Sequence, residues 1–327
     1  MKQKISWGIL GLGSIAHKFA KDLQLVSDAQ LVAVASRNTE KAAHFSKEYH
    51  TAYAFGSYEE LFHCNDVDVI YIATPHTHHA AIAIQAMEAG KHVLCEKPMG
   101  VNSAEVQKMI TAAQKNNVFL MEALWTRFNP AIQKIKAVID EGLIGEIKHI
   151  QADFAFPALD RAEESRLLNP NLAGGSILDI GIYPIFLSYL LLGKTDVITA
   201  TSKMYKTGVE VQTSMIFDYP NAQAILYSGL NSNSEMRAEI SGEKGTIIIH
   251  PRWHETEGFS ILIGEEKKEI THLKLGKGYT HEIEEVHACL RTNKKQSDLW
   301  NHQNSIDLIY LLDLVRAKAG VIFPFEE

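Results

Sequence analysis

Residues 11–16, Gly-Leu-Gly-Ser-Ile-Ala, have the types and spacing that suit a phosphate-binding turn. The preceding apolar run predicts a β-strand and the following residues predict a helix, so the glycines stand at a strand-to-helix join. Gly11 allows the tight turn, Gly13 lets the backbone approach a pyrophosphate, and the small Ala16 lets the helix pack closely on the strand. The helix N-terminus offers unpaired N–H groups and a positive dipole to the phosphates. The pattern therefore predicts dinucleotide binding, with contacts at Gly11, Gly13, Ser14 and Ile15.

The residues after the next predicted strand, 31–35, indicate which dinucleotide is bound. In nucleotide domains specific for NAD this strand usually ends in an acid that binds the ribose hydroxyls. Here the strand is followed by Ser36 and Arg37. A hydroxyl and a guanidinium would bind a 2′-phosphate, which a carboxylate would repel, and Lys41 adds a second positive charge one helical turn further on. We therefore predict NADP, with NAD less favoured; the alternative is that Arg37 is a solvated loop residue.

The loop over residues 74–79, Thr-Pro-His-Thr-His-His, follows the strand predicted over 67–74. Loops at the carboxyl ends of parallel strands line the ligand crevice of such a domain. Three histidines in four residues could suggest a metal, but no Asp, Glu or Cys accompanies them at ligand spacing, so we predict no metal site. The expected roles are cofactor contact and capping of the next helix. The predicted cofactor contacts are Thr74, Pro75, His76 and His79.

A lysine follows the strand predicted over 92–96, in the sequence Glu96-Lys97-Pro98. This position is the crevice mouth, where the nicotinamide ring should lie. Lys97 could donate a hydrogen bond to the reacting oxygen, or its charge could lower the pKa of a neighbouring acid–base group. Glu96 is placed to orient it, and both residues are predicted cofactor contacts. The alternative is a surface salt bridge, against which Pro98 counts because it fixes the backbone where a flexible tip would suffice.

The first third of the chain alternates strand and helix. The strand predicted over 31–35 is apolar throughout, as in a parallel sheet covered on both faces. Strict alternation predicts right-handed crossovers and a doubly wound α/β sheet of the Rossmann type. Ser57 and Glu60 have capping-box spacing at the start of a short helix. The predicted strands are 5–10, 31–35, 67–74, 92–96 and 118–122, and the predicted helices are 16–25, 39–49, 57–62, 80–88 and 103–116.

The pattern changes near residue 124. Longer stretches follow in which polar and apolar residues alternate, which is typical of an antiparallel sheet with one solvated face. We therefore expect an NADP-binding domain over 1–123 and an α+β domain over 124–327 with a large, mostly antiparallel open sheet. That domain would bind substrate and form a homodimer through the sheet. The predicted strands are 147–156, 195–205, 212–217, 223–230, 236–241, 246–249 and 260–263, and the predicted helices are 130–141, 276–291 and 305–318.

The bulk composition excludes several classes of protein. The 327 residues carry 32 basic and 39 acidic side chains, a net charge of −7, which argues against general binding of nucleic acid or of an anionic membrane surface. The three cysteines, Cys64, Cys95 and Cys289, are widely spaced, as expected in a reducing compartment. We see neither a signal peptide nor an apolar run of transmembrane length. We therefore expect a cytoplasmic protein.

Together the motifs resemble those of a known family. The turn at 11–16, the Glu-Lys-Pro at 96–98, and residues 174–184, Gly-Gly-Ser-Ile-Leu-Asp-Ile-Gly-Ile-Tyr-Pro, are similar to the signatures of the Gfo/Idh/MocA oxidoreductases. That group includes glucose–fructose oxidoreductase and inositol dehydrogenase. Segments 95–102, 121–128 and 179–183 resemble more closely the branch of dimeric dihydrodiol dehydrogenases and NADP-dependent D-xylose dehydrogenases. The resemblance extends over nearly the whole chain.

The resemblance implies roles for particular side chains. Members like inositol dehydrogenase carry a histidine where this sequence has Tyr183, as the dihydrodiol dehydrogenase branch does. A free phenol has a pKa of about 10, and a nearby ammonium lowers it. The resemblance thus implies Tyr183 as general acid/base, Lys97 as its electrostatic partner, and Asp179 to orient substrate or support the lysine; direct proton transfer by Lys97 is the alternative. Substrate contacts implied in the same way are Trp125, Arg127, Phe154 and Phe156, with Trp253 and Tyr279 as weaker candidates.

The expected activity is hydride transfer between the nicotinamide of NADP and a carbon that bears a hydroxyl group. The substrate would be a sugar, with oxidation at C1 of an aldose as the leading expectation, or a vicinal diol. The alternative is a non-catalytic NADP-binding sensor on the same fold, since a fold does not fix a function. The presence of Lys97, Asp179 and Tyr183 counts against a sensor, which has no need of this set.

Overall fold

The computed structural model describes residues 4–326, and the terminal residues 1–3 and 327 of the two expected domains lie outside that range. The chain divides into two compact units, each assembled from two segments of the sequence. A single boundary between residues 123 and 124 therefore does not describe these units. The first unit is Met1–Phe128 with Leu275–Ile306, and the second is Asn129–Lys274 with Asp307–Glu327.

The first unit contains a six-stranded parallel sheet in the order β3-β2-β1-β4-β5-β6. This is the doubly wound sheet that the alternating pattern predicted. Every residue of β4 and of β6 is buried, because helices cover a parallel sheet on both faces. The strands are β1 (Ile5–Leu10), β2 (Ala29–Ala35), β3 (Tyr53–Phe55), β4 (Val69–Ile72), β5 (His92–Glu96) and β6 (Leu120–Ala123).

The helices of this unit begin where the sequence offers caps. Ser57 and Glu60 form the predicted capping box: Ser57 Oγ accepts from the Glu60 amide, and Glu60 Oε2 accepts from the Ser57 amide. Asn38 and Asn102 cap the following helices through their side-chain oxygens. The helices are α1 (Ser14–Leu23), α2 (Thr39–Tyr49), α3 (Tyr58–Phe62), α4 (His79–Glu88), α5 (Ser103–Lys115) and α8 (Tyr279–Arg291).

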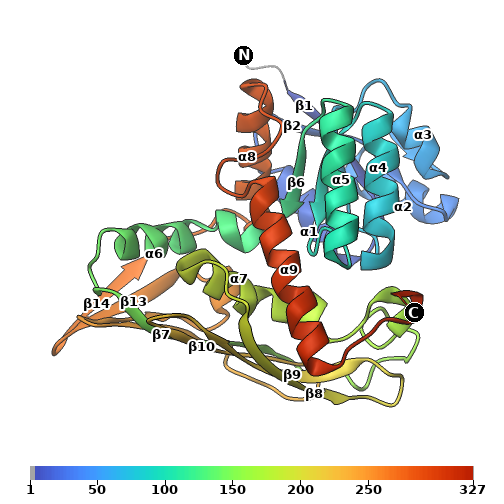
Figure 1. Cartoon of the computed structure of the whole chain (residues 1–327). Helices are drawn as coiled ribbons and strands as arrows, with labels where there is room; N and C mark the ends of the chain where they lie inside the picture. Colours follow the sequence, from blue (N-terminus) through green and yellow to red (C-terminus); the bar gives the residue numbers. More distant parts are fainter. Residues whose placement is uncertain (1–3, 327) are drawn as a thin grey trace. The chain divides into compact units, whose positions relative to one another are not determined.

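Helix α8 comes late in the sequence but packs beside α1, in the same way that α4 packs beside α5 (Figure 1). The Asp22 carboxylate, at 2% exposure, accepts hydrogen bonds from the amides of Lys277 and Tyr279 and so fixes the turn that starts α8. Gly276, with φ of +63°, lies so close that an added Cβ would be 2.4 Å from Asp22 Oδ1. These hydrogen bonds join the start of α8 to α1. Residues 275–306 therefore belong to the unit that contains the six-stranded parallel sheet.

The second unit contains an eight-stranded sheet in the order β14-β13-β12-β11-β7-β10-β9-β8. Its neighbours are antiparallel except for β7 and β10, which pair in parallel, so the expectation of a mostly antiparallel open sheet is confirmed. Strand β14 was not predicted because its run of charged residues lacks apolar alternation. The strands are β7 (Ile147–Ala155), β8 (Val197–Met204), β9 (Glu210–Asp218), β10 (Gln223–Gly229), β11 (Ala238–Gly242), β12 (Thr246–Ile249), β13 (Gly258–Ile263) and β14 (Glu266–Thr271).

Three helices complete the longer elements: α6 (Pro130–Asp140), α7 (Ile182–Leu192) and α9 (His302–Ala319), the last divided between the two units at residue 306. Helix α7 packs on β7 and β10. It is preceded by a π-helical segment, η4 (Ile177–Gly181). An 18-residue window within Pro170–Leu192 has a mean hydropathy of 1.6, so this stretch is long and apolar enough to cross a membrane, contrary to our expectation that no such run exists. However, 78% of its apolar window is buried inside the structure, as in the core helix of a folded domain.

Candidate functional site

The glycine turn after β1 has the geometry that its sequence predicts. Gly11 adopts φ of +88°, and an added Cβ would lie 2.7 Å from the Ala73 carbonyl group, so only glycine fits between the two strand ends. Beside Gly13 an added Cβ would meet nothing within 4 Å, which leaves the approach to the turn open. Helix α1 follows with neither a side-chain cap nor an acid in its first turn, so an anion would meet the helix dipole there.

At the end of β2, the predicted 2′-phosphate contacts differ in exposure. Ser36 is 9% exposed, and its hydroxyl accepts a hydrogen bond from the Asn38 amide. Arg37 and Lys41 are exposed. The Arg37 charge assists burial in lowering the pKa of His78, so this guanidinium lies near the histidine loop of the same unit. The loop after β2 therefore presents the positive charge of Arg37 at the strand end where NAD-specific domains usually carry an acid.

The loop over 74–79 contains two buried hydroxyls, Thr74 Oγ1 and Thr77 Oγ1, which have no hydrogen-bond partner among residues 4–326. Buried polar atoms are almost always paired, so two orphans in one loop fit a site that a ligand completes. Together with the open glycine turn, they fit a nicotinamide dinucleotide.

His79, one of the predicted cofactor contacts, is buried within the first unit. It is 0% exposed, and its Nδ1 and Nε2 lie 2.8 and 2.9 Å from the carbonyl oxygens of Pro98 and Thr74. Burial lowers the pKa of this imidazole, and the two carbonyls oppose that shift. A neutral ring donates to only one of them. His79 thus links the loop at 74–79 to the turn that carries Lys97.

Glu96 stabilises the turn after β5 through hydrogen bonds of its carboxylate. The Glu96 carboxylate accepts from the Lys97 amide at 3.1 Å and from the Tyr71 hydroxyl. Tyr71 is fully buried and stacks on Phe19 at 3.7 Å, so Glu96 points into the core and orients the backbone of the turn. Burial, followed by the charge of Glu96, raises the pKa of Tyr71 well above its usual value. The Lys97–Pro98 peptide bond is cis.

Glu122 at the end of β6 also fixes this turn, and we had not singled it out from the sequence. Its Oε1 accepts from the Met99 amide at 2.9 Å, and its Oε2 accepts from Trp300 Nε1 at 3.0 Å and Ser305 Oγ at 2.8 Å. Burial raises the pKa of this carboxyl, while the hydrogen bonds oppose the shift. The signal available in the sequence was an acid in an otherwise apolar strand.

Two of the predicted substrate contacts have partners within the first unit. Trp125 is 8% exposed and stacks on Tyr279, with ring centroids 4.9 Å apart. Arg127 is half-buried, and its Nε donates to the Leu299 carbonyl at 3.0 Å. That contact holds the segment before α9, so it supports a structural role for Arg127.

In the second unit, Tyr183 belongs to a cluster of rings. Tyr183 lies in the first turn of α7, at 5% exposure, with its ring 5.4 Å from that of Phe154 and 5.2 Å from that of His254. Phe154 and His254 stack at 4.2 Å. His254 was missed in the sequence because it lies in a short helical turn that no motif covers. Phe156 is half-buried with its ring 6.2 Å from Phe154, whereas Trp253 is a core residue that donates from Nε1 to the Asp153 carbonyl.

Asp179, on the π-helical segment η4, forms an ion pair with Arg166. Arg166 Nη1 donates to Asp179 Oδ1 at 2.7 Å; the Asp179 side chain is 7% exposed and the Arg166 side chain 50%. Arg166 lies in the irregular segment before η3 (Pro170–Leu172), where sequence patterns give no signal. Lys97 belongs to the first unit, and Asp179 and Tyr183 belong to the second.

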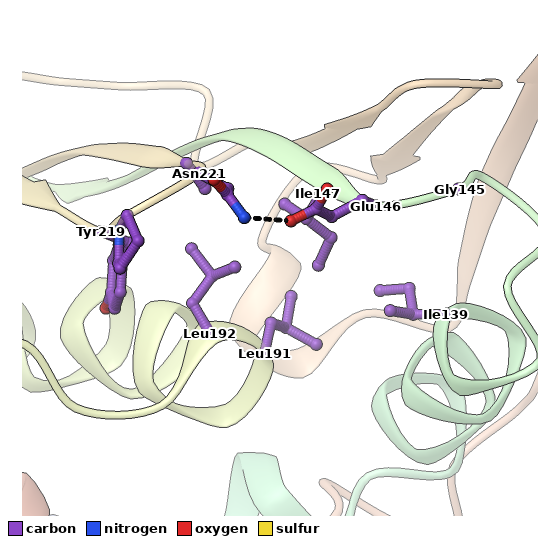
Figure 2. A pocket seen from close by; sticks show the side chains of 10 residues that line it. Ile139, Gly145, Glu146, Ile147, Leu191, Leu192, Tyr219 and Asn221 are labelled. Carbon is purple, nitrogen blue, oxygen red and sulfur yellow. Dashed lines mark hydrogen bonds between the residues drawn. The ribbon is translucent and has the colours of Figure 1, made fainter.

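Residues 4–326 contain no cluster of metal ligands, and a pocket in the second unit lies away from the predicted site residues. No group of three or more His, Cys, Asp or Glu side chains could hold a metal ion there. The second unit contains a pocket of about 390 Å³. Figure 2 shows Ile139, Leu191 and Leu192 on its apolar side and the hydrogen bond from Asn221 to Glu146 at its edge. None of the predicted site residues lines this cavity.

Two family models match the chain, one in its N-terminal part and one in its C-terminal part. Residues 5–124 match the oxidoreductase family with an NAD-binding Rossmann fold, and residues 132–248 match the GFO/IDH/MocA C-terminal domain. The chain belongs to the GFO/IDH/MocA oxidoreductase family. This family membership confirms the resemblance stated from the motifs.

This oxidoreductase is similar over its full length to curated relatives. Trans-1,2-dihydrobenzene-1,2-diol dehydrogenase from Mus musculus is 37% identical, with 98% of each chain covered, and the Homo sapiens protein of that name is 34% identical with the same coverage. Among solved structures, aldose-aldose oxidoreductase from Caulobacter crescentus, complexed with glycerol, matches with a TM-score of 0.89 at 24% identity, covering 97% of this chain and 98% of that one. A 3-ketoreductase from Actinomadura kijaniata in complex with NADP matches with a TM-score of 0.84 at 23% identity and the same coverage.

Proposed function

We propose that this protein is an NADP-dependent dehydrogenase that oxidises a CH–OH group of a vicinal diol or of a sugar at C1 of an aldose. The observation that carries the proposal is the 37% identity, over 98% of both chains, to a relative named for a diol dehydrogenase. The positions of Lys97 after β5 and of Tyr183 in a ring-lined part of the second unit support it.

The proposal gives each side chain a distinct role. Tyr183 removes the proton from the substrate hydroxyl during oxidation and returns it during reduction. The ammonium group of Lys97 stabilises the phenolate form, since a nearby positive charge lowers a phenol pKa. Asp179, held by Arg166, orients a substrate hydroxyl, and Phe154 and Trp125 supply apolar surface to the substrate. The bound cofactor accepts or donates the hydride.

Two substitutions test these roles. Tyr183→Phe keeps the ring against Phe154 and removes only the hydroxyl, so we expect the turnover number to fall by about 100-fold or more. Lys97→Met should lower the turnover number and shift the pH profile of Tyr183-dependent turnover toward higher pH. Near wild-type turnover of Tyr183→Phe would contradict the tyrosine-base assignment and favour direct proton transfer by Lys97.

The rival function is a non-catalytic NADP-binding sensor. The discriminating experiment follows reduced nicotinamide by absorbance while a panel of aldoses and vicinal diols is offered with NADP, and separately measures cofactor binding. Turnover on any member of the panel supports the dehydrogenase. Tight NADP binding without turnover on the whole panel would favour the sensor.

We further propose a homodimer formed through the open face of the eight-stranded sheet. Ile216 and Ile225 stand directly opposite each other in β9 and β10 at 44% and 48% exposure, and Val197 on β8 is 63% exposed. Exposed apolar side chains grouped on one sheet face favour burial against a partner. Light scattering should give twice the chain mass, and Ile216→Lys with Ile225→Lys should give the monomer mass. A monomeric wild-type protein would contradict the proposal.

A cytoplasmic location is also a proposal. Its support is that Cys64, Cys95 and Cys289 are all free thiols in the structure, two of them buried. Free thiols persist where glutathione keeps them reduced. Fractionation of the native host with antibody detection would test this, and recovery outside the cytoplasmic fraction would overturn it.

A further inference from the structure

A buried acid, Glu210, contacts the glycine-rich turn that leads into η4. Glu210 is the first residue of β9 and is 1% exposed. Its Oε1 accepts a hydrogen bond from the Ile177 amide at 2.8 Å. Gly175, at φ of +114°, lies against the same carboxyl group, since an added Cβ would be 2.3 Å from each of the two carboxyl oxygens. The carboxyl therefore occupies the space that a side chain at position 175 would need.

The backbone that Glu210 contacts leads directly to the proposed active-site residues. Ile177 is the first residue of η4, Asp179 is its third, and Tyr183 follows two residues after its end. A second contact supports the segment: Ser176 Oγ lies 3.0 Å from Ser228 Oγ on β10. π-Helical turns are rare and occur frequently at functional sites, where their backbone geometry must be maintained by neighbouring groups.

We propose that Glu210 is a positioning residue: by holding the Ile177 amide, its carboxyl group sets the backbone that carries Asp179 and Tyr183. The proposal deepens the proposed dehydrogenase function and rests on it. Glu210 touches backbone rather than reacting atoms, so its effect on turnover would act through the placement of Asp179 and Tyr183. A misplacement of about 1 Å can lower a rate on the order of 100-fold.

The protonation state of Glu210 sets how firmly it holds the turn. Burial raises the pKa of this carboxyl to about 7, while the amides of Ile177, of Glu210 itself and of Ser176, with the charge of Arg316, oppose the shift. Arg316 is the charged side chain acting on Glu210 among the described residues, and it is held by Glu326 and Asp313. The buried carboxyl binds its proton more tightly than it would in an opened, solvated turn, so rising pH favours opening. The hold on the turn should therefore weaken as the pH rises toward about 7.

The first test needs no variant and no substrate. Amide hydrogen exchange of the wild-type protein, resolved to residues 174–183 and corrected for the intrinsic dependence on pH, is measured from pH 5.5 to 8.5. We expect protection of the Ile177 amide to decrease as the pH rises to about 7 and to level off above it. Protection that does not change over this range would overturn the proposal.

The second test uses Glu210→Gln and Glu210→Ala, with Glu266→Gln, an exposed glutamate on β14, as the matched control. We expect the turnover number to fall about tenfold in Glu210→Gln and further in Glu210→Ala. KM for NADP should stay within about twofold, because the cofactor turn lies in the other unit. The pH profile of turnover should lose the ionisation near 7 in Glu210→Gln only, and Glu266→Gln should match the wild type.

Three results would count against the positioning role. The first is wild-type turnover in folded Glu210→Gln, and the second is an unchanged pH profile of turnover in that variant. The third is a loss of kcat/KM that comes only from a higher KM, with kcat unchanged. A purely structural role would lower the melting temperature without these changes. If the wild-type protein shows no turnover on any diol or sugar, the proposed function fails, while the exchange experiment still decides whether Glu210 holds the turn.

Discussion

Arg166 and Asp179 form an ion pair in which the carboxylate is buried and the guanidinium is half exposed. Arg166 Nη1 lies 2.7 Å from Asp179 Oδ1, and Nη2 lies 3.5 Å from Oδ2. The pair helps to orient the Asp179 carboxylate on η4. It also compensates a charge that would be costly to bury alone.

Loss of this pair should affect turnover more than folding. Arg166→Met removes the ion pair between Arg166 and Asp179, so we expect a turnover number lowered by about tenfold or more and a free energy of unfolding lowered by about 1 kcal/mol. Arg166→Lys should restore part of the turnover. Lys148→Met, which removes an exposed ion pair with Glu146 in the same unit, is the control. Equal turnover in Arg166→Met and the control would show that Asp179 needs no such partner.

Cofactor preference should depend on Arg37. In Arg37→Ala, kcat/KM with NADP should fall about 10-fold to 100-fold, while kcat/KM with NAD stays near the wild-type value, because only NADP carries the 2′-phosphate. Lys41→Ala should have a smaller effect of the same kind. Lys47→Ala, an exposed lysine at the other end of α2, serves as the control. Parallel losses with NAD and NADP would argue against 2′-phosphate recognition.

The ionisation of Glu210 should lower the free energy of unfolding as the pH rises. Its pKa of about 7 in the folded protein lies above the usual 4.5, so the folded state binds the proton more tightly than the unfolded state. The contribution is complete below about pH 4.5, decreases between 4.5 and 7, and is lost above, a change of roughly 3 kcal/mol. Glu210→Gln lacks this titration. Urea unfolding from pH 4.5 to 8.5 should show the variant gaining stability relative to the wild type as pH rises; parallel curves would contradict this.

Glu122 should be a stability residue for the Lys97 turn. Glu122→Gln replaces an oxygen by an NH₂ group that cannot accept hydrogen bonds, although Met99, Trp300 and Ser305 all donate to this carboxyl. We expect the free energy of unfolding to fall by about 2 kcal/mol. Glu88→Gln, an exposed glutamate at the end of α4, is the control. Equal unfolding free energies for the two variants would show that the three donors find other partners.

Local sequence signals predicted most elements of the fold because those elements depend on neighbouring residues. The helix at Thr39–Tyr49 and the strand at His92–Glu96 have the predicted bounds, since caps and strand-ending prolines act within a few positions. The three-residue strand β3 was missed because it is too short to show a period. Helix α8 was predicted as a helix but not as part of the first unit, because its placement depends on Asp22, more than 250 residues away.

The sequence by itself determined the glycine turn, the Arg37 position and the lysine after β5, because each follows from residue type at a strand end. It also identified Asp179 and Tyr183 through the family motif. Only the tertiary structure decided which groups hold them. Glu122, Glu210 and His254 are distant in sequence from the residues they contact, and Arg166 reaches Asp179 from an irregular segment without a sequence signal. Such hydrogen bonds, ion pairs and ring contacts exist only once the chain has folded.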